Sequence, residues 1–168
     1  LKGNNIIDQV EQLEKELADD IINNTNRAVR PKGLVCTDNI ITNIGLTESA
    51  KRDSGEVSST LTHNSIGTGT TTPTVSDTDL QTEDTGGSYA RLGYAASGQR
   101  KVSNQTGKYG MLWDDSKVSA VPISITESGV HWNVSTGNTM HARVTFTAFS
   151  MTTGDLFVTQ INELHQNG

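Results

Sequence analysis

The residues best suited to chemistry are four acidic side chains that lie close together: Asp77, Asp79, Glu83 and Asp84. Hard cations such as Ca²⁺ bind several carboxylate and carbonyl oxygens, so this cluster is a candidate calcium site. It lacks the ligand spacing and the central glycine of an EF-hand loop. Capping of a short turn over residues 77–80, in which Asp77 accepts backbone N–H groups, explains the same residues. We adopt that interpretation and predict no metal site and no cofactor.

Histidines are the other candidate metal ligands, and the chain has four: His63, His131, His141 and His165. His131 and His141 fall in segments that are predicted to be neighbouring strands, where two imidazoles could share a metal. No third ligand lies at a fixed spacing from them. We therefore interpret the strand histidines as packing or hydrogen-bonding residues.

Catalysis requires a nucleophile with a base, or paired carboxylates in a cleft. Cys36 is the single cysteine and has no recognisable motif around it, and the chain has no GxSxG nucleophile elbow. A single cysteine also excludes an intrachain disulfide and a cysteine-based zinc site. Glu127 is a lone acid before a Ser-Gly step, and we interpret it as structural. The chain is thus predicted not to be an enzyme.

The amino-acid composition argues against further classes of protein. The chain has 19 acidic and 13 basic residues, a net charge of −6, and no basic stretch, which argues against nucleic-acid binding. No apolar run approaches membrane-spanning length and no signal-peptide pattern is present, so membrane insertion is not expected. Only 33% of residues are hydrophobic. Such chains fold as thin β-sheets with one wet face, or gain burial by assembling with copies of themselves.

One helical pattern is present, from Asn4 to about Arg30. Its apolar residues recur at spacings of four, three, four and four: Ile6, Val10, Leu13, Leu17 and Ile21. Pro31 ends the pattern. This stripe is interpreted either as an assembly interface with other copies or with a neighbouring protein, or as a face packed on the chain's own sheet. About three heptads do not secure a coiled coil, and we favour assembly.

Beyond residue 31 the pattern changes to short alternating segments separated by Gly, Asn and Asp turns, which is typical of strands. Strands are expected at residues 34–37, 39–46, 56–66, 89–96, 110–113, 118–126, 130–134, 139–150 and 156–161. Residues 47–55 are polar and are predicted to be a loop, and residues 97–109 a long hairpin or an exposed loop. The expected fold is mainly β: a jelly-roll-like antiparallel β-sandwich over residues 32–168, preceded by a helical arm over residues 1–31.

Two blocks of the sequence carry a resemblance to a known family. IGTGTTTPTVSDTDLQTE, from Ile66 to Glu83, resembles a motif of small structural proteins of tailed bacteriophages and related archaeal tailed viruses. ISITESGVHWNVSTGNTMHARVTFTAFSMTTGDLFVTQI, from Ile123 to Ile161, is similar to the same family in order and spacing. In that family the Glu-x-Gly step at Glu127 is a turn feature. The N-terminal third and residues 85–115 carry no part of the resemblance.

The resemblance implies a non-enzymatic virion structural protein, located in the tail, the tail fibre or the particle surface. It would be a homo-oligomer, expected to be a trimer or hexamer, that contacts neighbouring virion proteins. One alternative is a capsid decoration (cement) protein. Another is a module that binds host-surface glycan through a loop with Ser97, Arg100, Lys101 and Lys108, and through exposed aromatics between Tyr94 and Trp113. A cellular surface or pilus-like protein of similar composition is a more distant alternative.

Overall fold

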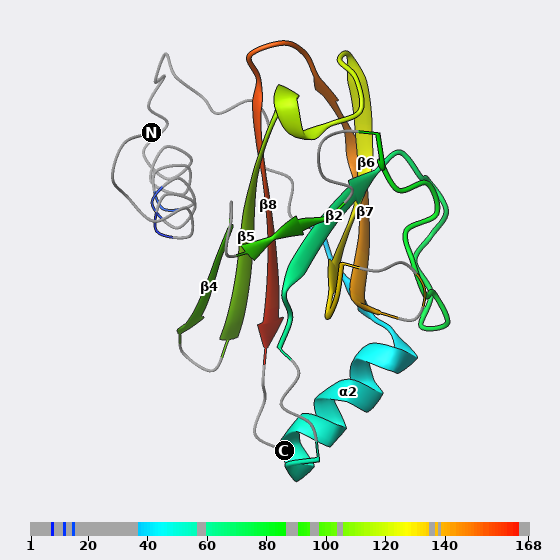
Figure 1. Cartoon of the computed structure of the whole chain (residues 1–168), viewed down its shortest axis with the longest axis vertical. Coiled ribbons are helices and arrows are strands. Elements are labelled where there is room, and N and C mark those ends of the chain that lie inside the picture. Colours follow the sequence, from blue (N-terminus) through cyan, green and yellow to red (C-terminus); the bar gives the residue numbers. More distant parts are fainter. Residues whose placement is uncertain are drawn as a thin grey trace.

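The computed structural model (Figure 1) describes residues 8, 12, 15, 37–56, 60–86, 91–94, 98–103, 106–134, 137 and 139–164. Asp8, Gln12 and Lys15 of the predicted arm are helical. The apolar stripe itself lies outside the described residues: Ile6, Val10, Leu13, Leu17 and Ile21. Cys36 lies outside them too. The assembly role of the arm therefore stays a prediction.

The described strands form two antiparallel sheets (Figure 1). The first has the order β1-β7-β6-β2-β3, and its strands are β1 (Ile40–Ile41), β2 (His63–Gly67), β3 (Leu92–Gly93), β6 (Ile123–His131) and β7 (Met140–Met151). The second has the order β4-β5-β8, with β4 (Gly98–Ser103), β5 (Thr106–Asp114) and β8 (Leu156–Leu164). The prediction of a mainly β, antiparallel fold is confirmed.

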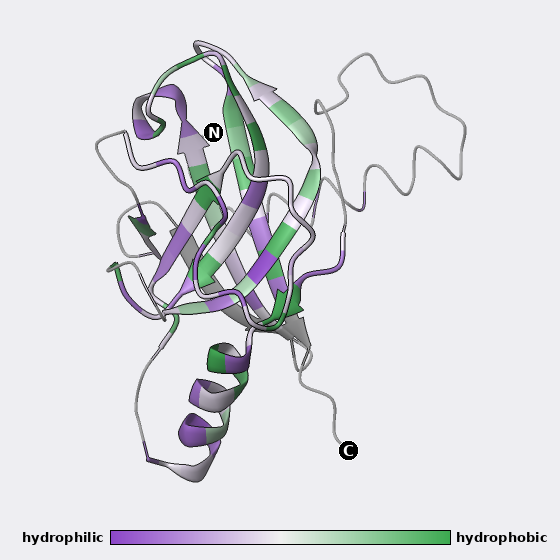
Figure 2. Cartoon of the chain, turned by 90° about the vertical axis from the view of Figure 1, so that its right-hand side faces the viewer, coloured by the Kyte–Doolittle hydropathy of each residue, from purple (hydrophilic) through white to green (hydrophobic). Residues whose placement is uncertain are grey.

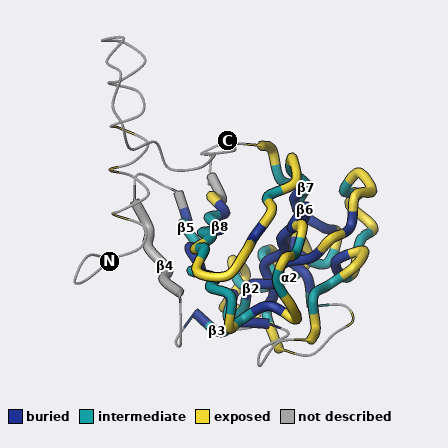
Figure 3. The backbone as a smooth tube through the Cα atoms, turned by 90° about the horizontal axis from the view of Figure 1, so that it is seen from above, coloured by how far each residue is buried: buried dark blue, intermediate teal, exposed yellow. Residues whose placement is uncertain are grey.

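The hydrophobic core takes side chains from both sheets. Ile66, Ile125 and Val130 come from the first sheet, and Met111 and Trp113 from the second, and all are at most 1% exposed. Figure 3 shows the buried residues gathered in the strands and the exposed ones in the connections between them. Removing these side chains from water is the main term that stabilises the fold.

A buried polar chain also links the two sheets. The Thr159 hydroxyl of β8 donates to Asn64 Oδ1 of β2 at 3.1 Å and accepts from Trp113 Nε1 of β5 at 3.1 Å. Ser128 of β6 donates to the same Asn64 oxygen at 3.3 Å. Because buried polar groups are costly unless bonded, these contacts help to hold β8 of the second sheet to β2 of the first.

Residues 43–54 form a helix, α2 (Asn43–Ser54), where the sequence analysis expected the end of a strand and a loop. That prediction was wrong because the helix buries only Gly45 and so has no apolar stripe. The residues at its two ends indicate the helix instead. Thr42 caps the N-terminus, where its Oγ1 accepts from Gly45 N at 2.9 Å, and Gly55 ends the helix with φ 78°. The bonds from Gly55 N to Arg52 O and from Glu56 N to Lys51 O make a Schellman motif.

α2 lies beyond the end of the sheets and is anchored at the start of β7 (Figures 1 and 2). Thr42 Oγ1 donates to Met140 O at 2.6 Å, and Thr42 N donates to His141 O at 2.9 Å. A Cβ on Gly45 would lie 2.3 Å from His141 O, so the helix can approach β7 only because this residue is glycine. The Arg52 guanidinium lies 5.1 Å from the centre of the Trp132 ring, which adds a cation–π contact.

β6 is continuous, although the sequence analysis expected two strands separated by a turn at Glu127. Ser128 and Gly129 pair with Ile66 and Ser65 of β2 on one side and with β7 on the other. This pairing makes β6 a central strand, and the Glu-Ser-Gly step is extended rather than a turn. The sequence could not reveal this because the pairing partners lie far away in the chain.

The other strands follow the predictions to different extents. The segments 139–150 and 156–161 are strands β7 and β8, and residues 98–114 form a β4–β5 hairpin. The strands expected at 39–46 and 89–96 shrink to two residues each. Among the described residues, no helix is long and apolar enough to cross a membrane.

Candidate functional site

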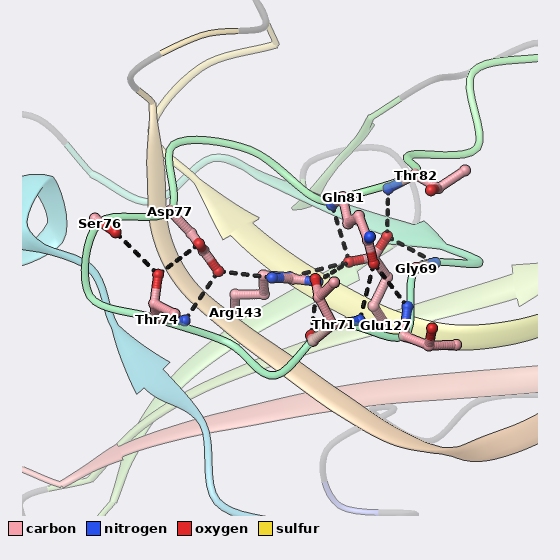
Figure 4. Close-up of polar contacts among 10 residues, drawn as sticks. Gly69, Thr71, Thr74, Ser76, Asp77, Gln81, Thr82, Glu127 and Arg143 are labelled. Atoms are coloured by element: carbon pink, nitrogen blue, oxygen red, sulfur yellow. Dashed lines mark hydrogen bonds and ion pairs between the residues drawn. The ribbon is translucent and has the colours of Figure 1, made fainter.

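The covering loop, residues 68–82, connects β2 to Glu83 and lies over one face of the first sheet (Figure 4). Its base is closed by a bridge between Gly67 and Glu83 and by a bond from Thr68 N to Thr82 O at 2.9 Å. A surface loop whose ends meet in this way is of the Ω type. Most of its side chains are exposed, whereas Leu80 is buried. The loop coincides with most of the first block that carries the family resemblance.

Glu127 holds the covering loop from below. Its side chain is fully buried, and Oε1 accepts from Gly69 N at 3.0 Å and from Thr82 N at 2.8 Å. Oε2 accepts from Gln81 N at 3.1 Å. A Cβ on Gly69 would lie 2.4 Å from Glu127 Oε1, so glycine is needed there for the loop backbone to reach the carboxylate. The structural role predicted for Glu127 thus has a geometric basis in three backbone hydrogen bonds.

Arg143 on β7 supplies the counter-charge (Figure 4). Its Nη2 lies 2.8 Å from Glu127 Oε2, and its Nη1 lies 2.6 Å from Asp77 Oδ2 in the covering loop. Nη2 also donates to Thr71 O at 3.2 Å. The arginine is 2% exposed, so these ion pairs are largely shielded from water. One guanidinium therefore connects β6, β7 and the covering loop.

The predicted capping role of Asp77 is wrong in its direction. The Asp77 carboxylate accepts from Thr74 N at 3.0 Å and from Thr74 Oγ1 at 2.7 Å, which precede it, and does not cap residues 77–80. Burial on its own raises the pKa of Asp77, but the bonds from Thr74 and Arg143 outweigh it and lower that pKa below its ordinary value. Asp77 is therefore held ionised as a partner of Arg143.

Arg91 forms a second ionic centre at the other end of the loop. Its Nε and Nη2 donate to the two oxygens of Glu83 at 2.8 and 2.9 Å, and Nη2 also donates to Asp79 at 2.6 Å. Nη1 donates to Thr139 Oγ1 at 2.8 Å, next to the start of β7. Burial lowers the pKa of Arg91, but Glu83 and Asp79 raise it above its ordinary value. Arg91 is thus a fixed cation that holds two acidic side chains.

Each member of the acidic cluster consequently has partners within the protein. Asp77 pairs with Arg143, Asp79 and Glu83 pair with Arg91, and Asp84 accepts from Ser119 N at 2.9 Å. Among the described residues, no group of three or more His, Cys, Asp or Glu side chains is placed to hold a metal ion. The cluster is best explained as the attachment of the covering loop.

The histidines lie in different surroundings. His131 Nε2 lies 2.6 Å from Ser65 Oγ, and both side chains are fully buried. A serine beside a histidine is a pairing used by nucleophilic enzymes, and here neither side chain is exposed. His63 lies opposite His131 in the β2–β6 register. His141 is on the neighbouring strand β7, as predicted, but its ring packs edge-on against Trp132 at 5.1 Å.

His131 is expected to make the fold sensitive to mild acid. Burial, followed by the charges of Arg91 and His63, lowers the pKa of His131 well below its ordinary value of 6.5. Between those two values the unfolded chain binds a proton that the folded chain does not. The free energy of unfolding should therefore fall as the pH drops below 6.5, by at most about 1.4 kcal/mol per pH unit.

Denaturant titrations between about pH 7.5 and 5 check this expectation, because the unperturbed pKa values of Asp and Glu, about 3.9 and 4.3, lie below that range. The variant His131→Gln should be less stable at neutral pH. Its free energy of unfolding should depend less on pH between about 7.5 and 5 than that of the wild type. His63, whose pKa is also lowered by burial and by Arg91, contributes in the same direction and should leave a residual slope. An unchanged slope in His131→Gln would show that His131 is not the titrating group.

The residues expected to face a receptor lie largely in one hairpin. Arg100 and Lys101 belong to β4 and Lys108 to β5, and the register places Lys101 opposite Lys108. Ser97 lies outside the described residues. The expectation of exposed aromatics nearby is wrong for Tyr94 and Trp113, which are 4% and 1% exposed and belong to the core.

Sequence reasoning missed Arg91 and Arg143 as the residues that organise the site. Each is a lone arginine in a segment predicted to be a strand, and such a residue is seldom fully buried unless it is paired. A lone arginine in a predicted strand is therefore a signal that a buried ion pair is present. The lone Glu127 and the acidic cluster were the candidate partners in the sequence. The pairing itself depends on strand register, which the sequence alone does not specify.

No protein-family model, no curated protein and no solved structure matches the chain.

Proposed function

We propose that this chain is a non-enzymatic structural protein of a tailed virus, assembled as a homo-oligomer in the tail, the fibre or the particle surface. In this proposal the two sheets are the layers of a jelly-roll-like β-sandwich over residues 32–168. The helical arm over residues 1–31 anchors it to other copies or to a neighbouring virion protein. The chain acts by presenting a rigid surface, and chemistry on a substrate has no part in its role.

The observation that carries this proposal is the junction between the two blocks that resemble virion proteins. Asp77 and the backbone of Gln81 and Thr82, in the first block, bond to Glu127 and Arg143 in the second. The two resembling segments thus fold into one unit, in which the ionisable side chains hold the covering loop on the sheet. A loop fixed by buried ion pairs is suited to a scaffold that must keep its shape.

The proposal is tested by locating the protein in virus particles. An antibody raised against the purified full chain should label density-gradient-purified tailed particles in electron micrographs, and the chain should co-sediment with them. Labelling of tails, fibres or heads then assigns the position, and labelling of expanded heads alone would favour a decoration protein. If the chain stays with host soluble proteins and no particle is labelled, the proposal is wrong.

A second candidate, recognition of a host-surface glycan, is favoured by the basic hairpin. The register places Lys101 opposite Lys108 and Arg100 opposite Tyr109, so positive charge gathers at one end of the second sheet. An anionic saccharide has the charge that such a group of basic residues would attract. A saccharide-dependent binding signal from the purified chain would favour this candidate, in which the protein is the receptor-binding element of the particle.

A further inference from the structure

The edges of the two sheets are protected to different extents. The four edge strands are β1, β3, β4 and β8. β1 and β3 are only two residues long, and β4 contains Arg100 and Lys101. Short length and positive charge are two ways in which proteins prevent an edge strand from pairing with another chain. Each of these three edge strands therefore carries a protective feature. β1 covers only Ala142 and Arg143, however, so among the described residues no strand pairs with residues 144–151 of β7 on that side.

β8 carries none of these features. It is nine residues long and pairs with β5 in one unbroken register, from Thr106 opposite Leu164 to Asp114 opposite Leu156, without a bulge. Residues 156–162 contain neither a charged residue nor a proline. In the described part of the chain, no other strand pairs with β8. Its outer row of backbone N–H and C=O groups is thus a template for one more strand.

Apolar side chains lie beside this edge. Leu156, the first residue of β8, is 52% exposed. The Phe157 ring stacks on Phe149 of β7 with 4.7 Å between ring centres and lies 5.9 Å from Phe146. These three phenylalanines pack against the core and are only partly buried. A strand added to β8 would therefore gain apolar contacts in addition to backbone hydrogen bonds.

The distribution of charged residues indicates which molecule supplies the added strand. The chain has a net charge of −6, so the long-range electrostatic interaction between two copies is repulsive. We define the seam as residues 144–150 of β7 and 156–162 of β8, with the sequences VTFTAFS and LFVTQIN, and none of these residues is charged. Two copies that meet seam to seam bring no like charges together there. A two-fold axis makes such a contact self-complementary.

We propose that β8 pairs antiparallel with β8 of a second copy of this chain, with Leu156 and the three phenylalanines packed alongside. The second sheets of the two copies would then form one continuous sheet across a two-fold axis. This inference rests on the homo-oligomer of the proposed function and assigns its interface. It also assigns self-association to a sheet edge, in contrast to the helical arm favoured by the sequence pattern.

The test introduces positive charge at the seam of the full chain. Leu156 and Asn162 are both exposed, so the double variant Leu156→Lys, Asn162→Lys should keep the fold. Light scattering over roughly a hundredfold range of concentration should show self-association of the wild type. The double variant should associate at least about tenfold more weakly, because lysines on an edge strand oppose pairing. The control for the leucine change is Leu46→Lys on α2, a Leu→Lys substitution at 53% exposure, which should associate as the wild type does.

Hydrogen exchange of the wild type supplies an independent measurement if the double variant proves unstable. Amides of residues 156–162 should become more protected as the protein concentration rises, whereas those of α2 should not. A wild type that is monomeric at all concentrations, a double variant no weaker than Leu46→Lys, or exchange in β8 that does not depend on concentration would each overturn the proposal. Antibody labelling of particles reports on the proposed function separately, so a failed interface and a failed function are distinguishable.

Discussion

Replacing Glu127 with alanine is expected to lower the free energy of unfolding by about 3–5 kcal/mol, the usual cost of removing one partner of a buried ion pair. The change leaves the guanidinium of Arg143 buried at 2% exposure, with Asp77 as its remaining charged partner among the described residues. It also removes the acceptor of three backbone N–H groups, from Gly69, Gln81 and Thr82. Both losses fall on the covering loop, which should exchange its amide hydrogens faster than the strands do.

Denaturant unfolding measures this effect, and Glu48→Ala is the matched control. Glu48 forms an ion pair of the same length, 2.8 Å, with Lys51 on the surface of α2, where such pairs contribute little to stability. In the double variant Glu127→Ala, Arg143→Ala the two costs should not add, because the residues share one interaction. A cost for Glu127→Ala no larger than that for Glu48→Ala would contradict the role assigned to this carboxylate.

Replacing Arg91 with methionine is expected to cost about 3 kcal/mol or more of stability. Methionine fills a similar volume but leaves Glu83, whose side chain is 8% exposed, without its two hydrogen bonds from the guanidinium. Asp79 keeps its bond from Gly137 N at 2.8 Å, so part of the site should survive. Arg91→Lys should recover only a fraction of the loss, since an ammonium cannot make the paired contact of a guanidinium.

Thermal and denaturant unfolding measure this second effect against Lys117→Met. Lys117 pairs with Asp114 at 2.9 Å, but that pair is more exposed and should be worth less than about 1 kcal/mol. If Arg91→Met and Lys117→Met destabilise the chain equally, Arg91 contributes no more to stability than a lysine in an exposed ion pair. The second ionic centre would then not hold the covering loop. We expect Arg91→Met to lower the free energy of unfolding more than Lys117→Met does, and Arg91→Lys to lower it less than Arg91→Met does.

The class of the fold and two of its long strands follow from the sequence. Alternation with a period of two is a local property, and it identified residues 139–150 and 156–161, which are β7 and β8. The same rule missed α2, because only Gly45 of that helix is buried and no apolar stripe marks it. Thr42 and Gly55, at its two ends, carried the information that periodicity lacked.

Tertiary structure alone decided what the charged residues do. Glu127 and Arg143 are 16 residues apart, and Asp77 and Arg143 are 66 apart, so their contacts exist only once β6 and β7 pair and the covering loop folds over them. Shifting that register by one residue would move every side chain to the opposite face. β8 is an edge strand because, in the described part of the chain, it pairs with β5 alone, although its sequence is that of an ordinary strand. Residue types can be read locally, whereas ion pairs and free edges depend on which distant segments become neighbours.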